Sequence, residues 1–125
     1  MKLILLIGLA GLIGTLARYA CVRAVSYLFP GFPWGTLAVN ILGAFIAGFC
    51  YVLCHCKFQQ YSSWFPVLFI GFLGAFTTFS SFALESMRFF FEAQYGKFLS
   101  NILLQNITGL LAAGGGMWLA KMIFK

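Results

Sequence analysis

Uncharged polar side chains recur at helical spacing inside two strongly apolar stretches of this chain. Thr36 and Asn40 stand four residues apart in one stretch, and Asn101 and Gln105 repeat that interval in another. Residues four apart lie on the same face of a helix, so each pair forms a polar stripe. Hydroxyl and amide groups supply hydrogen-bond donors and acceptors without net charge, as a pathway for a small ion requires.

A run of phenylalanine and serine residues adds a second kind of chemistry. Phe79 and Phe82 share a helical face with Glu85, and Ser80 and Ser81 stand between the two phenylalanines in the sequence. Aromatic residues at this spacing usually pack in a core or face lipid. The rim of a phenyl ring is electropositive, however, so paired rings edge-on to a path attract an anion without trapping it. The residues alone leave both interpretations open.

The stretches that carry these residues are predicted to cross a membrane. Of the 125 residues, 62% are hydrophobic and 8% are charged, and the mean hydropathy of +0.98 lies far outside the range of soluble domains. About 20 apolar residues suffice for a helix to cross roughly 30 Å of hydrocarbon. The sequence therefore predicts a single all-α membrane domain with four transmembrane helices, over about residues 3–27, 35–54, 64–88 and 98–120.

The third of these spans contains residues that favour a break in the helix. Gly74 and the β-branched pair Thr77 and Thr78 lie near its midpoint. A break would free backbone carbonyls, which are tolerated at that depth only inside protein or around water or an ion. If two copies of the chain met there, two carbonyls from each would form an oxygen cage suited to a hard cation such as Na⁺. We therefore expect a third helix broken near the bilayer centre.

The basic residues are divided evenly between the two sides of such a bundle. If both termini share one side, that side carries Lys2, Lys57, Lys121 and Lys125, and the other carries Arg18, Arg23, Arg88 and Lys97. The positive-inside rule then gives no preferred orientation, although a small chain also reaches such a balance by chance. Four helices cannot easily surround a polar pathway and also shield it from lipid. We expect an antiparallel, dual-topology homodimer with its two-fold axis in the membrane plane.

Three blocks of sequence carry a specific resemblance to a known family. They are Gly11-Leu12-Ile13-Gly14 leading to Arg18-Tyr19, Gly35-Thr36-Leu37-Ala38-Val39-Asn40 with Gly43, and Gly71-Phe72-Leu73-Gly74 leading to Thr77-Thr78-Phe79-Ser80-Ser81-Phe82. With the spacing between the blocks, the chain resembles the Fluc/CrcB family of fluoride channels along its whole length. The resemblance implies a passive, fluoride-selective channel that exports cytoplasmic fluoride and confers fluoride resistance, in the inner membrane of a bacterium.

The resemblance also implies roles for particular residues. It makes Asn40 the pore amide, and it makes the carbonyls of Gly74 and Thr77 the ligands of a structural Na⁺ at the dimer centre. Arg18 matches an arginine near the pore vestibule, and Glu85 matches an acidic residue at the end of the phenylalanine face. With Asn40, the expected fluoride pore comprises Thr36, Phe79, Ser80, Ser81, Phe82, Asn101 and Gln105.

The fourth span departs from the family's better-known pattern. That pattern has an aromatic hydroxyl and a serine where this chain has Asn101 and Gln105. Both replacements keep hydrogen-bond donors, so the existence of a polar track is still expected while its details differ.

Two other function classes compete with a channel. A small proton-coupled exporter of the multidrug resistance type is also short, four-span and dual-topology, but it needs a carboxylate embedded in the membrane. The acidic residues are Glu85 and Glu92, which we expect near a helix end and in a loop. A packing subunit that transports nothing would leave the polar stripes unexplained.

Enzymes, metal sites and nucleic-acid binding have little support in the sequence. No nucleotide-binding loop or catalytic triad pattern appears, so no enzyme is predicted. Cys54-His55-Cys56, together with Cys50, fits no standard zinc spacing, and we interpret these residues as incidental. The net charge of +6 is divided between two membrane faces and gives no case for nucleic acid. The expected partners are fluoride, a second copy of the chain and membrane lipid.

Overall fold

The computed structural model describes residues 1–57 and 64–124, and every element in them is helical. Two long helices come first, α1 (Lys2–Leu28) and α2 (Trp34–Lys57). A wide, π-helical segment η2 (Pro66–Leu73) leads into one turn of helix α3 (Gly74–Phe76), and α4 (Phe79–Phe91) follows. The last helix is α5 (Tyr95–Ile123). η2, α3 and α4 together make the third crossing of the bundle.

Four helices are long and apolar enough to cross a membrane, as the sequence predicts. They are Lys2–Leu28, Trp34–His55, Pro66–Phe91 and Tyr95–Ile123. Compared with the predicted bounds, the third helix continues to Phe91 instead of ending near residue 88. The fourth begins at Tyr95 instead of residue 98. This chain is therefore a multi-pass membrane protein, and its last two helices are joined by a very short turn.

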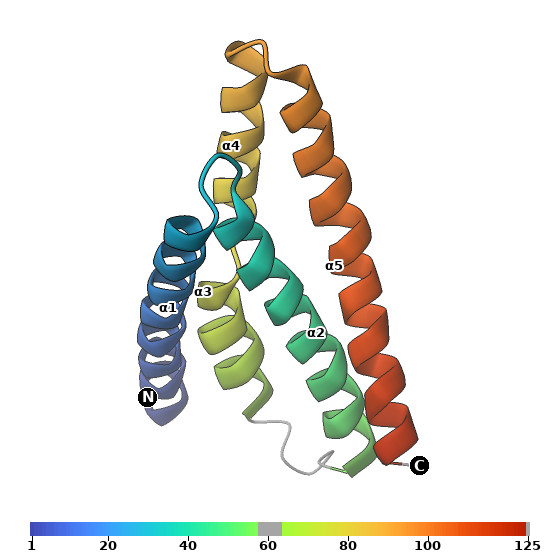
Figure 1. The fold of residues 1–125 in the computed structure, drawn as a ribbon. Helices are drawn as coiled ribbons and strands as arrows, with labels where there is room; N and C mark the ends of the chain where they lie inside the picture. The colour runs from blue at the N-terminus through green and yellow to red at the C-terminus, as the bar shows by residue number, and fades with distance from the viewer. Residues whose placement is uncertain (58–63, 125) are drawn as a thin grey trace.

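The chain crosses the bundle four times in alternating directions, so both termini lie at the same end of the molecule (Figure 1). We call this end the terminal end, and the opposite one, with the α1–α2 loop and the α4–α5 turn, the turn end. α5 lies along α2, whereas α1 lies on the other side of the molecule against η2 and α3. The α4–α5 hairpin extends beyond the α1–α2 loop.

α2 and α5 approach each other so closely that two glycines are needed at their crossing. A Cβ atom at Gly48 would overlap the carbonyl of Ala113, and one at Gly116 would overlap the carbonyl of Phe45. Because lipid supplies no hydrophobic drive between helices, small residues that let backbones touch are a main source of attraction in a membrane. These contacts hold α5 in a fixed position on α2.

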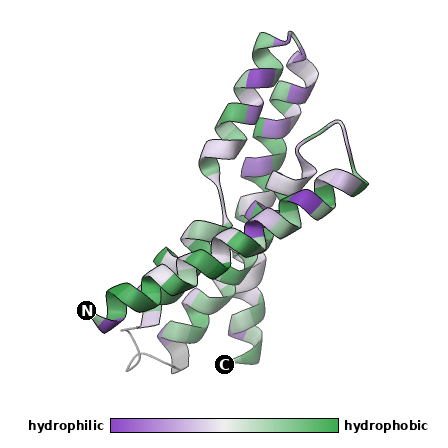
Figure 2. Cartoon of the chain, turned by 90° about the vertical axis from the view of Figure 1, so that its left-hand side faces the viewer, coloured by the Kyte–Doolittle hydropathy of each residue, from purple (hydrophilic) through white to green (hydrophobic). Residues whose placement is uncertain are grey.

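The outer surface of the bundle is made of large apolar side chains. On α1, Leu9, Leu12 and Leu16 are each more than half exposed, and so are Leu110 and Leu111 on α5. Figure 2 shows the first part of α1 as almost wholly hydrophobic, while hydrophilic residues recur on the α4–α5 hairpin. Such a surface is stable against hydrocarbon, so polar side chains inside the bundle need either partners or a function.

Candidate functional site

The third crossing is interrupted at Thr77 and Thr78, which separate α3 from α4. Their backbones are extended, with ψ of 161° at Thr77 and 110° at Thr78. The amide of Thr77 still donates to the carbonyl of Leu73 at 3.0 Å. The amide of Thr78 turns away and donates to a side chain on α2. The carbonyl of Gly74, its partner in a continuous helix, therefore receives no hydrogen bond from Thr78.

That side chain is Asn40, which joins α2 to the break and to α5. Its Oδ1 accepts from the amide of Thr78 at 2.8 Å, and its Nδ2 donates to the carbonyl of Thr78 at 3.1 Å and to Oε1 of Gln105 at 3.0 Å. Since a backbone amide can only donate, the bond from Thr78 fixes which end of the Asn40 amide is oxygen. Both protons of Nδ2 are consequently engaged.

α4 begins with a small network of hydroxyl groups. Thr78 Oγ1 accepts from the amide of Ser81 at 3.2 Å and donates to Ser81 Oγ at 3.0 Å, and Ser80 Oγ lies 3.3 Å away. This is an N-cap, in which a side chain satisfies one of the free amides of the first turn. The cap presents hydroxyl groups at the positive end of the α4 dipole.

The two phenylalanines of α4 follow directly. The ring centroids of Phe79 and Phe82 lie 5.4 Å apart and the ring planes make an angle of 66°, an edge-to-face arrangement. Phe82 is buried, whereas the side chain of Phe79 is 77% exposed in the single chain. The rings therefore stand next to each other, and one of them is left without cover.

A second set of polar contacts lies one helical turn closer to the turn end. Thr36 Oγ1 donates to Glu85 Oε1 at 2.6 Å, and Asn101 Nδ2 donates to Ser86 Oγ at 2.9 Å. Ser86 Oγ in turn donates to the carbonyl of Phe82 at 2.8 Å. Thr36 of α2 and Asn101 of α5 thus both bond to α4, at Glu85 and Ser86. The stripes of α2 and α5 bond to each other one turn away, through Asn40 and Gln105.

The expectation that Glu85 lies near a helix end is wrong. α4 continues to Phe91, so Glu85 stands inside the helix, half-buried and bonded to Thr36. The predicted span stopped at Arg88 because that residue is charged, but a charged side chain does not end a helix, and Arg88 remains in helical register, with 3.8 Å between its Nε and Glu92 Oε1.

Arg18 lies beside the break. Its Nη1 donates to the carbonyl of Thr77 at 3.3 Å, across the contact between α1 and α3. Arg18 and Glu85, which the resemblance places at the ends of the pore, are thus bonded to different parts of the bundle: Arg18 to the residue after α3, and Glu85 to Thr36 of α2. The guanidinium contacts the same carbonyl that the family resemblance assigns to Na⁺.

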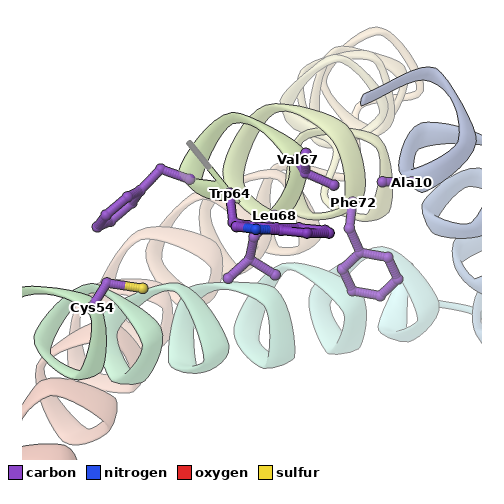
Figure 3. Close-up of a pocket in the computed structure, with 7 residues that line it drawn as sticks. Ala10, Cys54, Trp64, Val67, Leu68 and Phe72 are labelled. Carbon is purple, nitrogen blue, oxygen red and sulfur yellow. The ribbon is translucent and has the colours of Figure 1, made fainter. Parts of the chain in front are cut away.

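A cavity of about 430 Å³ opens along the break and is lined by polar and aromatic residues together. Its lining includes Asn40, Gly74, Thr78, Phe79, Phe82 and Gln105. A second cavity of about 490 Å³, between η2 and the facing parts of α1 and α2, is different. Its lining is apolar and includes Ala10, Cys54, Trp64, Val67, Leu68 and Phe72 (Figure 3). Only the first cavity offers groups that can replace the water around an ion.

Sequence reasoning missed two residues of this arrangement as members of the site. Thr78 was expected only as part of the helix break, and Ser86 was not considered. The signal for Thr78 was its residue type, because threonine is a preferred N-cap residue, and its side chain does accept from the amide of Ser81. Ser86 gave no comparable signal, because its role depends on Asn101 of another helix. Within residues 1–57 and 64–124 no three His, Cys, Asp or Glu side chains gather as a metal site, and the side chain of Cys56 lies outside the described residues.

Comparison with known proteins gives a consistent result. Residues 5–117 match the family described as CrcB-like protein, Camphor Resistance (CrcB). A protein of Legionella pneumophila (strain Lens) named fluoride-specific ion channel FluC is 40% identical over 120 residues, which cover 95% of this chain and 90% of that protein. Proteins of the same name from Koribacter versatilis (strain Ellin345) and Hahella chejuensis (strain KCTC 2396) are 39% and 38% identical over 118 residues, covering 94% of this chain and 94% and 93% of theirs.

Proposed function

This chain belongs to the CrcB-like protein family, and on that premise we propose that it is a passive, fluoride-selective channel rather than an enzyme. The relatives named fluoride-specific ion channels span nearly the whole chain. The observation that carries the proposal within this molecule is the cavity at the break. There the polar residues Gln105 and Thr78 and the aromatic residues Phe79 and Phe82 border one space inside an apolar bundle.

Fluoride is small and strongly hydrated, so a pore must replace its water with donors. The α4 N-terminus supplies a positive dipole end and the hydroxyls of Ser80 and Ser81. The edges of Phe79 and Phe82 then supply a weak attraction that does not trap the ion. Asn101 and Thr36 stand one turn farther along and continue the polar track toward the turn end.

We propose that the channel exports fluoride from the cytoplasm across a bacterial inner membrane. Hydrogen fluoride crosses lipid unaided and dissociates in a less acidic cytoplasm, where fluoride collects. A negative interior potential drives the anion outward at about 2.3 kcal/mol per 100 mV. A passive pore is sufficient for this task, and no coupling ion is required.

We also propose a structural Na⁺ held by the carbonyls of Gly74 and Thr77 from two copies of the chain. The Gly74 carbonyl fits this role, because it receives no bond from Thr78 and lies at the negative end of the η2–α3 helix. One lone pair of the Thr77 carbonyl oxygen accepts a hydrogen bond from Arg18, so this oxygen would coordinate the ion with its second lone pair. The ion would neutralise carbonyls that face one another and so tie the two copies together.

The Na⁺ proposal predicts cation-dependent stability. Exchanging Na⁺ for N-methylglucamine, which is too large for a carbonyl cage, should lower the temperature at which the purified protein loses its dimer. K⁺ should restore the dimer less well, because its larger radius fits such a cage poorly. Equal stability in all three cations would contradict the site while leaving the channel proposal intact.

A second copy of the chain is proposed because a polar groove cannot face hydrocarbon. Phe79 is 77% exposed, and Ser80 and Gly74 are also exposed in the single chain, all three along the break. Unpaired carbonyls and hydroxyls at membrane depth must be covered by protein or line a water-filled space. Two antiparallel copies would cover each other's break and line two pores between them.

One observation favours an alternative function, that of a proton-coupled exporter. Glu85 stands inside α4 and is half-buried, as an exchanging carboxylate would be. Thr36 holds this carboxylate at 2.6 Å, however, and the relatives are named as channels. A passive channel moves net charge, so fluoride efflux from K⁺-loaded liposomes should require valinomycin. Efflux that is driven by a pH gradient without valinomycin, and that exceeds the hydrogen fluoride leak of protein-free liposomes, would favour the exporter.

The first test is fluoride efflux from liposomes that contain the purified protein, with chloride as the control ion. Selective fluoride efflux is expected, and Phe79→Ile should slow it roughly ten-fold by removing a ring edge worth about 1.4 kcal/mol. Phe91→Ile is the matched control, because Phe91 is an equally exposed ring at the far end of the same helix. No fluoride efflux from a folded dimer would reject the proposed function.

A further inference from the structure

One residue that lines the break cavity carries a buried donor that the hydrogen-bond network leaves unused. Among the described residues, three buried side-chain atoms have no hydrogen-bond partner: Glu85 Oε2, Asn101 Oδ1 and Gln105 Nε2. Two of these are oxygens that accept hydrogen bonds and therefore repel an anion. Gln105 Nε2 is a donor. It is the one atom of the three with which an anion can form a favourable contact.

The orientation of the Gln105 amide is set by a chain of bonds that begins at the backbone of the break. The amide of Thr78 donates to Asn40 Oδ1, which turns Asn40 Nδ2 toward α5. Nδ2 can only donate, so it must meet the oxygen of Gln105, at 3.0 Å. The nitrogen of Gln105 is thereby directed away from Asn40. Each amide in the series fixes the next one.

Leaving such a donor unpaired is costly unless something binds it. A buried polar group without a partner has lost its hydrogen bonds to water and gained none in return. The side chain of Gln105 is only 9% exposed, and it lines the same cavity as Phe79 and Phe82. Since its Nε2 is shielded in the single chain, an ion reaches it only after losing water and after a small displacement of the side chains that cover it.

We propose that Gln105 Nε2 contacts the permeating ion directly and that Asn40 is a positioning residue, which acts by fixing the orientation of Gln105. This assignment rests on the proposed fluoride channel and deepens it. It differs from the role that the resemblance implies for Asn40, because both Nδ2 protons of Asn40 are already bonded to protein. The chain thus uses an amide on α5 where its family has a hydroxyl.

The first measurement uses the unaltered protein in lipid, with ¹⁵N in the side-chain amides of asparagine and glutamine. Adding fluoride should shift the Gln105 Nε2 resonance and leave the Asn40 Nδ2 resonance in place. Chloride at the same concentration should shift neither. A fluoride-induced shift at Asn40 without one at Gln105 would overturn the assignment. Because no substitution is involved, this readout does not depend on whether a variant folds.

Substitution gives the second readout. Gln105→Met keeps the length of the side chain and removes the donor, so fluoride efflux should fall about 10- to 100-fold, the loss of one hydrogen bond to a charged group. Thr108→Val is the matched control on α5, because the hydroxyl of Thr108 is bonded to its own helix at Leu104 and makes no contact with the cavity. Efflux through Gln105→Met equal to that through the control would contradict the proposal.

Asn40→Asp tests the positioning role. An aspartate still accepts from the amide of Thr78 but cannot donate to Gln105, so the Gln105 amide should turn its nitrogen toward residue 40. The fluoride-induced shift at Gln105 should then disappear while the dimer persists. If the shift remains, Asn40 does not orient Gln105. If the wild type itself shows no fluoride efflux, the proposed function fails, and that result is separate from these.

Discussion

Thr78 lies between α3 and α4 and makes polar contacts with its amide, its carbonyl and its hydroxyl. The amide and carbonyl bond to Asn40, and the hydroxyl bonds to Ser81. The bond from the Thr78 amide to Asn40 and the bond from the Ser81 amide to the Thr78 hydroxyl replace two bonds that a continuous helix would have made, which is why an extended residue is tolerated there. The interruption of the helix thus lets the Thr78 backbone fix the side chain of Asn40 on α2, which in turn bonds to Gln105 on α5.

Arg18 donates to the carbonyl of Thr77, the neighbour of Thr78, and we predict that its charge matters for ion entry. Arg18→Gln removes a positive charge that is partly buried against the Thr77 carbonyl. Fluoride efflux should fall roughly ten-fold, because a charge near the path raises the local anion concentration. A partly buried charge is screened less than an exposed one, so much of the loss should persist at high salt.

Arg23 on the same helix provides the control, since it is exposed. Arg23→Gln should cause a smaller loss that vanishes as ionic strength rises. The measurement is the initial rate of efflux for both variants between roughly 10 mM and 1 M salt, a range over which the Debye length falls from about 30 Å to 3 Å. Identical salt dependence for the two variants would contradict a special role for Arg18.

Which residues lie on a polar face could be predicted from the sequence, but their partners could not. Helical spacing places Thr36 with Asn40 and Asn101 with Gln105. It says nothing about which helix each residue meets, since that depends on how helices pack. Hence the pairing of Thr36 with Glu85 and that of Asn101 with Ser86 became known only from the structure.

At the scale of elements, the α2–α5 contact depends on the absence of side chains. We predict that Gly48→Ala destabilises the protein by about 1–3 kcal/mol, because the added methyl group would overlap the Ala113 carbonyl and push the helices apart. The same displacement should weaken the Asn40–Gln105 bond, which joins these two helices. The measurement is the unfolding temperature of the purified protein in detergent.

Gly114→Ala is the matched control on α5, since a Cβ atom there meets no atom within 4 Å. It should leave stability unchanged or raise it slightly, because alanine favours a helix more than glycine does. Equal destabilisation by both substitutions would show that the α2–α5 crossing is not the limiting contact.

The number and nature of the helices were predictable, because long apolar runs with polar separators determine them. The residues at which the third helix ends and the fourth begins were harder to predict. The predicted third span stops at Arg88, yet a helix can continue past a charged residue, as α4 does to Phe91. The π-helical geometry of η2 has no signature in the sequence that we could have used.

At the scale of the whole molecule, basic residues are evenly divided between the two ends. By their order along the sequence, Lys2, Lys57, Lys121 and Lys125 belong to the side of the termini, and Arg18, Arg23, Arg88 and Lys97 belong to the opposite side. Insertion is oriented by the Lys and Arg excess of short loops, so the chain has no reason to prefer one direction. The antiparallel dimer that we propose requires this balance, because its two copies must be inserted in opposite directions.

We therefore predict that shifting the balance abolishes function without unfolding the chain. Three lysines appended after Lys125 should hold the terminal end in the cytoplasm for every copy. Chains inserted in one direction cannot form an antiparallel pair, so cells that depend on this protein should lose fluoride resistance. Reporter fusions to the C-terminus would verify that the orientation has become uniform.

Co-expression separates a topological defect from simple misfolding. A second variant with Lys2→Gln, Lys57→Gln and Lys121→Gln should insert in the opposite direction, because its remaining charge lies mainly at the turn end. Each variant alone should be inactive, whereas the two together should restore fluoride resistance through a mixed dimer. Activity of either uniformly oriented variant alone would exclude the antiparallel dimer, since a single orientation cannot bring the two breaks together about an in-plane axis.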